Sequence, residues 1–263
     1  MIHADKIHLP INRSPRFRMA WKNILYLILA VIAVTVGFRP DATGNEDRAA
    51  RVAAKVSPRL KIEVAEKKLK WGTPVYMRIF KESNELELWM RGNEKNGEYV
   101  LFRNYKICFW SGTLGPKLKQ GDHQSPEGFY RVTVDRMNPN SRYHLSFNLG
   151  YPNAYDKENN RTGAYLMVHG DCVSIGCYAM GDKNIEEIYT LAAAAFKNGQ
   201  KSFAVHCFPF RMIKARMTQD DVKESQWLPF WQDLEKGYQS FETHWRPPEA
   251  SVEGGHYVIK DDI

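Results

Sequence analysis

The sequence lacks the stripe of interleaved basic and aromatic residues that is typical of nucleic-acid-binding proteins. Its formal net charge is +7, from 37 Lys and Arg against 30 Asp and Glu, but the excess is spread along the chain. Nucleic acid is therefore not an expected partner. Internal repeats and low-complexity tracts are also lacking, and 43% of the 263 residues are hydrophobic. This composition excludes a wholly disordered chain and suffices for one large domain or two small ones.

Long apolar runs are scarce, and the clearest one, residues 24–38, lies near the N-terminus. It contains no charge and suits the core of a signal peptide, whereas a membrane span needs ~20 residues. We interpret residues 1–23 as a cytoplasmic basic segment and residues 24–38 as a signal peptide or an inner-membrane anchor, with cleavage left open. The positive-inside rule then places the rest of the chain in the periplasm. A buried core helix is the weaker alternative, because basic residues precede the run at Lys6, Arg13, Arg16, Arg18 and Lys22.

The rest of the chain divides by its hydrophobic pattern. Residues 39–72 alternate charges with alanine and show helical tendency but little apolar face, so we expect a charged tether. From Thr73 the pattern changes to strands, in which Val75, Met77 and Ile79 alternate with polar neighbours. The same kind of pattern recurs in residues 86–90, 99–109, 128–134, 164–168 and 202–208. These short runs predict a mainly β domain.

Helices are expected beside these strands. Residues 184–197 have an apolar stripe on one face and are followed by Asn-Gly, a helix stop. A second amphipathic stretch, residues 220–241, contains Pro229 and Gly237, which we expect to break it. Residues 256–259 read as a final strand. The predicted fold class is α+β, mainly β with packed helices.

Residues 169–180, HGDCVSIGCYAM, concentrate reactive side chains directly after a strand that ends at His169. A thiol attacks an amide as its thiolate, and a neighbouring imidazole takes the thiol proton and later protonates the leaving amine. We therefore expect Cys177 to be a nucleophile and His169 its base. Gly176 leaves room beside the nucleophile, and the backbone amides of Gly176, Cys177 and Tyr178 are expected to face the developing oxyanion.

Other interpretations of these residues stay open. Cys177 is a small buried core residue in one of them, and it forms a local disulfide with Cys172 in another. In a third, His169, Cys172, Cys177, His206 and Cys207 ligate zinc. The spacing H-x2-C-x4-C with a distant H-C pair fits no tetrahedral zinc motif well, so zinc is the weaker interpretation. His206, in an apolar strand, is more typical of a hydrogen-bonded core histidine.

The sequence has four cysteines, Cys108, Cys172, Cys177 and Cys207. An exported chain meets an oxidising compartment, in which disulfides form. With Cys177 kept free as a nucleophile, the other three allow at most one bridge. Our hypothesis is Cys108–Cys172, and non-reducing peptide mapping that finds both thiols free would contradict it.

The reactive segment resembles the active-site segment of the L,D-transpeptidase (YkuD-fold) family. Within this family it resembles the YafK branch of murein amidases, which detach covalently bound lipoprotein from peptidoglycan. The resemblance covers roughly residues 73–216, which we expect to form a YkuD-like catalytic domain, with residues 217–263 as a C-terminal helical extension packed on it. Further matching motifs are SPEGFY (125–130), NLGYPNAYD (148–156), YKIC (105–108), GPKLKQGD (115–122) and FPFRM (208–212).

The resemblance implies roles for individual residues. Cys177 matches the family's nucleophile and His169 its general base, and the carbonyl of Gly170 is expected to orient the imidazole. Ser174 and Gly176 match the S-x-G-C turn, whose amides build the oxyanion hole. The implied substrates are peptidoglycan stem peptides containing meso-diaminopimelate, and no metal or organic cofactor is implied.

Two positions depart from the pattern of most family members. Ile175 stands where S-H-G-C has histidine, and Ala179 stands where crosslinking members have the arginine of C-I-R, a bidentate partner for carboxylates. The YafK branch shares both departures. They favour hydrolysis of the amide between meso-diaminopimelate and the C-terminal lysine of a covalently attached outer-membrane lipoprotein. The alternatives are L,D-transpeptidation and, in another class, a non-catalytic wall-binding module.

Overall fold

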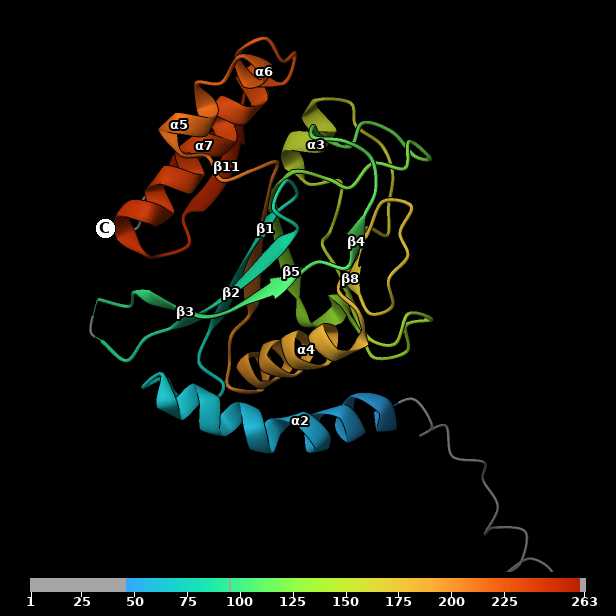
Figure 1. Ribbon diagram of the computed structural model, residues 1–263, viewed down its shortest axis with the longest axis vertical. Coiled ribbons are helices and arrows are strands. Elements are labelled where there is room, and N and C mark those ends of the chain that lie inside the picture. Colours follow the sequence, from blue (N-terminus) through green and yellow to red (C-terminus); the bar gives the residue numbers. More distant parts are fainter. Residues whose placement is uncertain (1–45, 95, 261–263) are drawn as a thin grey trace, which may run out of the picture. The chain divides into compact units, whose positions relative to one another are not determined.

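The structure, a computed structural model, describes residues 46–94 and 96–260. The predicted basic segment and the apolar run of residues 24–38 lie outside the described residues. Within the described part of the chain, no helix is long and apolar enough to cross a membrane. The described residues form two five-stranded sheets, a two-stranded hairpin and several helices (Figure 1).

The first sheet has β1 and β10 at its centre, and these two strands run parallel although 121 residues separate Phe80 from the start of β10 at Ser202. All other neighbours in this sheet are antiparallel. This long-range pairing brings residues 202–208 beside residues 75–80 at the centre of the sheet. The strand order is β3 (Tyr99–Lys106), β2 (Glu85–Arg91), β1 (Val75–Phe80), β10 (Ser202–Phe208) and β5 (Gly128–Thr133).

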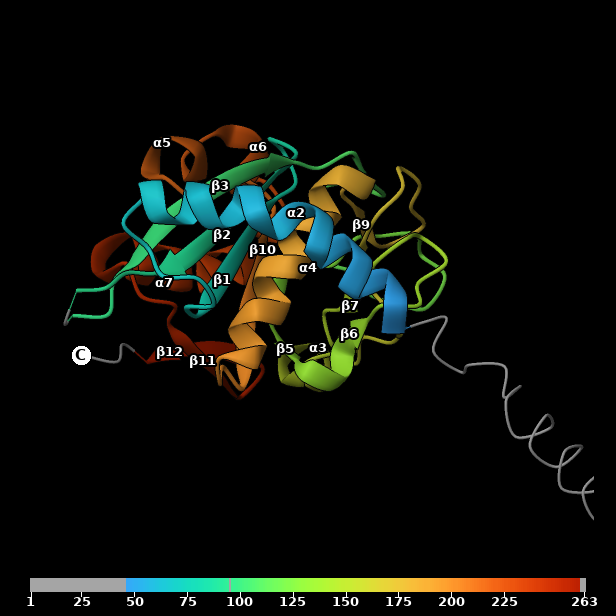
Figure 2. The same ribbon diagram turned by 90° about the horizontal axis from the view of Figure 1, so that it is seen from below.

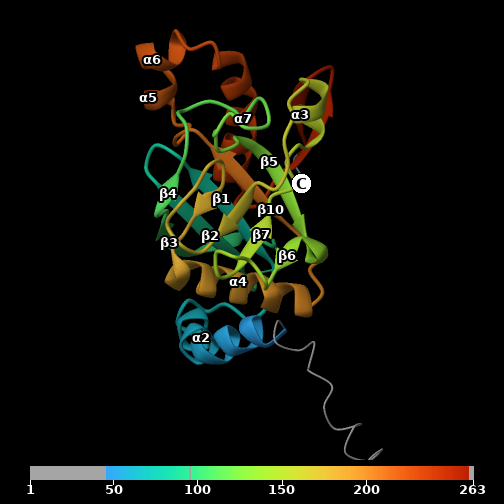
Figure 3. The same cartoon turned by 90° about the vertical axis from the view of Figure 1, so that its right-hand side faces the viewer.

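The second sheet consists of short strands and contains the reactive segment. Its β8 and β9 are parallel, and its other neighbours are antiparallel. Figure 3 shows these strands in front of the first sheet. The strand order is β4 (Phe109–Trp110), β9 (Tyr178–Ala179), β8 (Met167–His169), β7 (Ser146–Asn148) and β6 (Met137–Asn138).

The core lies between the two sheets. Phe147 of β7 meets Phe203 of β10 edge-on, with ring centroids 5.4 Å apart, and Val168 and Tyr178 of the second sheet are fully buried beside them. Because side chains alternate along a strand, residues next to these, such as His169, point to the opposite face of the second sheet. The packing of mixed sheets and helices confirms the predicted α+β fold class.

The opposite face of the first sheet is also buried, and here the structure differs from the predicted alternation. Tyr76, Arg78 and Phe80, the neighbours of the predicted core positions of β1, are all buried. Aromatic residues of α7 (Leu228–His244) cover them, including Tyr238 and Phe241. The sequence pattern showed only one apolar face of β1, because on the second face an arginine and a tyrosine take core positions beneath a helix.

Helix α4 (Asp182–Lys197) corresponds to the predicted helix, and begins two residues earlier than predicted. It lies across one end of the two sheets and contacts β1, β7 and β8. Helix α2 (Glu46–Glu66) packs against α4 from outside (Figures 1 and 2). Our expectation that this segment has little apolar face was wrong: valines and a leucine four residues apart are buried, Val52, Val56, Leu60 and Val64.

Helix α7 is continuous through Gly237, so the predicted break there is wrong, and Pro229 occupies the first turn, where its missing N–H costs nothing. A Cβ on Gly237 would lie 2.6 Å from the ring of Phe129, so the glycine permits close packing of α7 on β5. The domain boundaries at residues 73, 216 and 217 stay predictions. The remaining elements are η2 (Val134–Arg136), α3 (Ala154–Glu158), α5 (Lys214–Met217), α6 (Asp220–Lys223), β11 (Glu249–Glu253) and β12 (His256–Lys260).

Candidate active site

Strands β8 and β9 place the predicted nucleophile and base on one face of the second sheet. The parallel register pairs Val168 with Tyr178 and His169 with Ala179. Cys177 directly precedes β9, and the backbone N–H of Met167 donates a hydrogen bond to its Sγ, 3.3 Å away. Met167 and His169 are two residues apart on β8, so their side chains share a face. The two reactive side chains therefore lie on the same side of adjacent strands.

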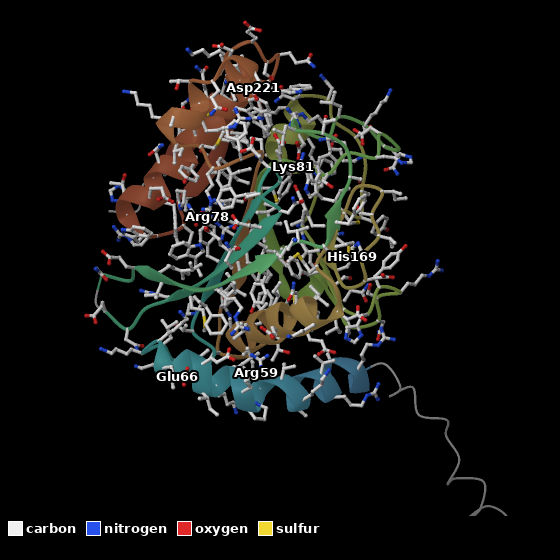
Figure 4. The ribbon with its side chains drawn as sticks, in the orientation of Figure 1. Arg59, Glu66, Arg78, Lys81, His169 and Asp221 are labelled. Carbon is white, nitrogen blue, oxygen red and sulfur yellow. A yellow bond between two sulfur atoms is a disulfide. The ribbon has the colours of Figure 1, made fainter. Side chains whose placement is uncertain are left out.

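The imidazole of His169 is held in one orientation. Its Nδ1 lies 2.5 Å from the carbonyl oxygen of Gly170, and since a carbonyl only accepts, Nδ1 carries the proton and Nε2 is the basic nitrogen. The ring of Tyr143 covers the imidazole, with centroids 4.7 Å apart and planes inclined by 30°. Figure 4 shows His169 on the side of the molecule formed by the second sheet. The predicted role of the Gly170 carbonyl agrees with this contact.

Burial sets the charge of both groups. It lowers the pKa of His169 below its ordinary 6.5, against smaller opposing effects of the Gly170 carbonyl and the Asp171 carboxylate. Burial also raises the pKa of the Cys177 thiol, although the Met167 amide and the Lys117 ammonium act in the opposite direction. At neutral pH the resting pair is thus a thiol beside a neutral imidazole. Such a pair attacks by transferring the proton as the sulfur–carbon bond forms.

The loop before Cys177 is shaped by Gly176 and Ser174. Gly176 has φ +143°, and a Cβ there would also press on Leu166 at 3.1 Å. Its N–H donates to Ser174 Oγ at 3.0 Å, and that hydroxyl donates to the carbonyl of Cys177 at 2.7 Å. The Gly176 amide, predicted to face the oxyanion, is therefore engaged within the turn in the resting site.

The backbone amide of Tyr178 stays a predicted oxyanion donor, while its side chain belongs to the core. Tyr178 lies within β9, which pairs with β8 on one side and with β4 on the other. Its side chain is fully buried between the sheets, and the hydroxyl donates to the carbonyl of Pro126 at 2.6 Å. These contacts give Tyr178 a part in the core, below the nucleophile.

Cys108 and Cys172 form a disulfide, as hypothesised, while Cys177 and Cys207 are free thiols. The alternative of a Cys172–Cys177 bridge is therefore wrong. The zinc alternative also loses a ligand, because the Cys172 sulfur is used in the disulfide. The bridge ties the reactive loop to the segment between β3 and β4, 64 residues earlier.

Sequence reasoning missed the part played by Ser125. Its hydroxyl is fully buried and donates to the carbonyl of Cys177 at 3.0 Å. Together with Ser174 it gives that carbonyl two hydroxyl donors, which hold the backbone at the nucleophile. The signal was present, since Ser125 opens the SPEGFY motif, but 52 residues separate it from Cys177.

His206 is a core residue, as interpreted from its apolar strand. The Tyr76 hydroxyl lies 2.8 Å from its Nδ1, and burial lowers the pKa of His206 to about 3.

This low pKa predicts that stability depends on pH. Between pH 6.5 and about pH 3 the His206 imidazole is protonated in the unfolded chain and neutral in the folded chain. The free energy of unfolding should therefore decrease by about 1.4 kcal/mol per pH unit on acidification in this range. Urea unfolding from pH 7.5 to 4.5 measures this slope, and a variant with His206→Gln should show a shallower one; equal slopes would contradict the assignment.

Comparisons with known proteins show the family of the chain. The family model described as the L,D-transpeptidase catalytic domain (YkuD) matches residues 76–201. The Escherichia coli (strain K12) protein named "Putative L,D-transpeptidase YafK" is 47% identical over 192 residues, which are 73% of this chain and 76% of that protein. The same figures hold for its counterpart in Escherichia coli O157:H7.

Two solved structures are more distant. The helical cell shape determining protein Pgp2 of Campylobacter jejuni is 18% identical, with a TM-score of 0.42 over 74% of this chain and 80% of that one. Bd1075 of Bdellovibrio bacteriovorus is 20% identical, with a TM-score of 0.35 over 66% and 58% of the two chains. The family assignment depends on the sequence matches, and the residues matched by the family model include the reactive segment. The chain belongs to the L,D-transpeptidase (YkuD) family and, within it, to the YafK branch.

Proposed function

We propose that this protein is a periplasmic cysteine amidase. Its substrate is the amide that joins meso-diaminopimelate of a peptidoglycan stem peptide to the side chain of the C-terminal lysine of an outer-membrane lipoprotein. The observation that carries the proposal is the placement of a free thiol and an oriented neutral imidazole on one face of adjacent strands. No metal or organic cofactor takes part.

In the first half of the reaction, Cys177 Sγ attacks the carbonyl carbon of the diaminopimelate residue while Nε2 of His169 takes the thiol proton. The resulting imidazolium gives this proton to the lysine nitrogen as the carbon–nitrogen bond breaks. The lipoprotein leaves with a neutral amine, and the stem peptide stays bound to Cys177 as a thioester. The Gly170 carbonyl keeps Nδ1–H oriented throughout, as the third group does in cysteine–histidine sites.

In the second half, His169 takes a proton from water, and the hydroxide attacks the thioester carbonyl. The carbon–sulfur bond breaks, the sulfur recovers the proton from the imidazolium, and a tripeptide with a free carboxylate is left on the wall. The oxyanion of both steps needs a donor at the nucleophile. We assign this to the backbone N–H of Cys177, with the amide of Gly176 available only when Ser174 turns away from it.

Ala179 supports hydrolysis over crosslinking. It is fully buried in β9, opposite His169 on one side and Phe109 on the other. Because it alternates with the core residue Tyr178, its side chain shares a face with Cys177 and His169. A methyl group there cannot bind a carboxylate, so the bidentate carboxylate partner of crosslinking members has no counterpart at this position. L,D-transpeptidation stays the alternative within the class, since both reactions share the thioester and differ in whether water or an amine resolves it.

The test uses the full chain and sacculi that carry the covalently attached lipoprotein, with Cys177→Ala as the matched control. Mass spectrometry follows the released protein and the muropeptides together. Release of intact lipoprotein with free tripeptide on the wall, by the unmutated protein alone, is the expected result. New diaminopimelate crosslinks without release would instead identify a transpeptidase. Equal sacculus binding by both proteins, with neither product formed, would identify a wall-binding module.

A further inference from the structure

We propose that α2 is part of the catalytic unit, and that its Arg48 is a positioning residue that holds the loop of residues 141–145 so that Tyr143 covers His169. The inference deepens the proposed function and rests on it for its catalytic consequence. It concerns a segment that the sequence pattern presented as a tether.

The first link joins α2 to the loop. Arg48 Nη1 donates to the carbonyl oxygens of Ser141 and His144, at 2.8 and 2.7 Å, across 93 and 96 residues of sequence. A guanidinium suits this task because its donors are fixed in one plane and stay charged at every physiological pH. Two carbonyls bound by one group determine both the position and the orientation of the loop.

A second link runs from α2 through α4 to the same loop. Lys55 Nζ lies 2.9 Å from one carboxylate oxygen of Glu186, and His144 Nε2 lies 3.1 Å from the other. His144 has φ +66°, a conformation that costs a residue with a Cβ free energy and persists where neighbouring contacts enforce it. The loop thus depends on external contacts for its shape, and those contacts come from α2 and α4.

The last link joins the loop to the base. The N–H of Gly170 donates to the carbonyls of Tyr143 and Leu145, at 3.0 and 3.1 Å. The Tyr143 ring lies over His169 while its own outer surface is exposed, 43% in all. This single ring therefore separates the imidazole from water on that side. When the loop moves, the cover of His169 changes, and so do the hydrogen bonds that hold Gly170, whose carbonyl orients Nδ1.

Several charged or titratable groups lie near His169. Asp171 follows Gly170, and Asp182 of α4 accepts from the Asp171 amide at 2.8 Å. Cys177 directly precedes β9, Tyr143 supplies its phenol, and His144 follows Tyr143 in the loop. Arg48 makes its hydrogen bonds to the backbone carbonyls of Ser141 and His144. We therefore expect its effect on the base to act through the position of the loop.

The experiment compares full-chain Arg48→Ala, Arg48→Lys and Tyr143→Ala, with Lys67→Ala as a control that removes an exposed charge just after α2. Lipoprotein release gives kcat and KM, and NMR titration follows the His169 imidazole. We expect Arg48→Ala to lower kcat roughly tenfold at nearly unchanged KM, because a displaced catalytic group loses rate rather than binding. The His169 titration should move to higher pH as water reaches the ring.

Tyr143→Ala should give the same two changes while leaving the Arg48 contacts in place, and Arg48→Lys should recover much of kcat, because an ammonium also donates to carbonyls. Unchanged kcat and an unchanged His169 titration in folded Arg48→Ala would overturn the proposal. So would an Arg48→Ala whose only change is a lower unfolding temperature. The NMR titration decides the positioning role even if no version of the chain releases lipoprotein, an outcome that would overturn the amidase function alone.

Discussion

Replacement of Cys177 by alanine is expected to abolish lipoprotein release, and replacement of His169 by alanine to lower kcat by roughly 10²–10⁴-fold. Of the free thiols in the part of the chain that the structure describes, Cys207 is buried in the core and Cys177 lies at the site, so loss of Cys177 removes the proposed covalent route. The imidazole contributes through proton transfer, and a thiol whose pKa is raised by burial depends strongly on that transfer. Release rates from sacculi at pH 7.5 measure both losses.

The pH profile of kcat/KM gives an independent check on the same pair. Because burial lowers the pKa of His169, the imidazole stays neutral to pH values below 6.5, and the acidic limb of the profile should lie there. His123→Asn is the matched control: His123 is exposed and has φ +55°, which asparagine tolerates well. Full activity in Cys177→Ala, or an acidic limb that is unchanged in the residual activity of His169→Ala, would contradict the assignment.

Replacement of Glu127 by alanine is expected to reduce the free energy of unfolding by roughly 3–5 kcal/mol, as breaking a buried ion pair does. Glu127 and Lys81 are both fully buried, with their charged atoms 3.0 Å apart. Lys81 is labelled in Figure 4. Glu127 also accepts from the Gly115 amide at 2.7 Å and from Trp231 Nε1 at 2.9 Å. Its removal leaves a buried ammonium whose pKa burial already lowers, together with two donors that lose their acceptor.

The exposed ion pair of Arg131 and Glu249 provides the comparison. These side chains are about half exposed, and Glu249→Ala should change the unfolding free energy by about 1 kcal/mol or less. A double variant, Lys81→Met with Glu127→Leu, should recover part of the loss of Glu127→Ala, because no charge is then left uncompensated. Urea unfolding at pH 7.5 measures all three; equal losses for Glu127→Ala and Glu249→Ala would show that burial of the pair does not matter.

The ion pair also connects the C-terminal part of the chain to the site. Trp231 of α7 contacts Glu127, and two residues earlier Ser125 donates to the Cys177 carbonyl. We expect Glu127→Ala to lower activity as well as stability for this reason. None of these partners was predictable from the sequence, because nothing in the local pattern around Trp231 indicates which carboxylate its indole nitrogen meets.

Local patterns predicted best where the information is local. The apolar stripe of α4 and the glycine after it identified that helix to within two residues. In α2 the buried stripe has only one residue per turn and lies among many charged residues, so the local sequence does not indicate its helical period clearly. In α7 Gly237 reads as a helix breaker, yet close packing against Phe129 outweighs its low helical propensity.

The sequence by itself determined the reactive segment, because the thiol, the imidazole and the glycine turn all occur within the nine residues 169–177. Hydrophobic period and turn residues likewise determined the fold class. Only the tertiary structure decided which face of β1 is covered by α7, that Ser125 supports Cys177, and that Arg48 reaches the loop beside His169. The physical reason is that the hydrophobic pattern of a segment indicates which of its side chains are buried. A hydrogen bond between residues about 50–100 positions apart depends instead on how whole helices and strands pack together.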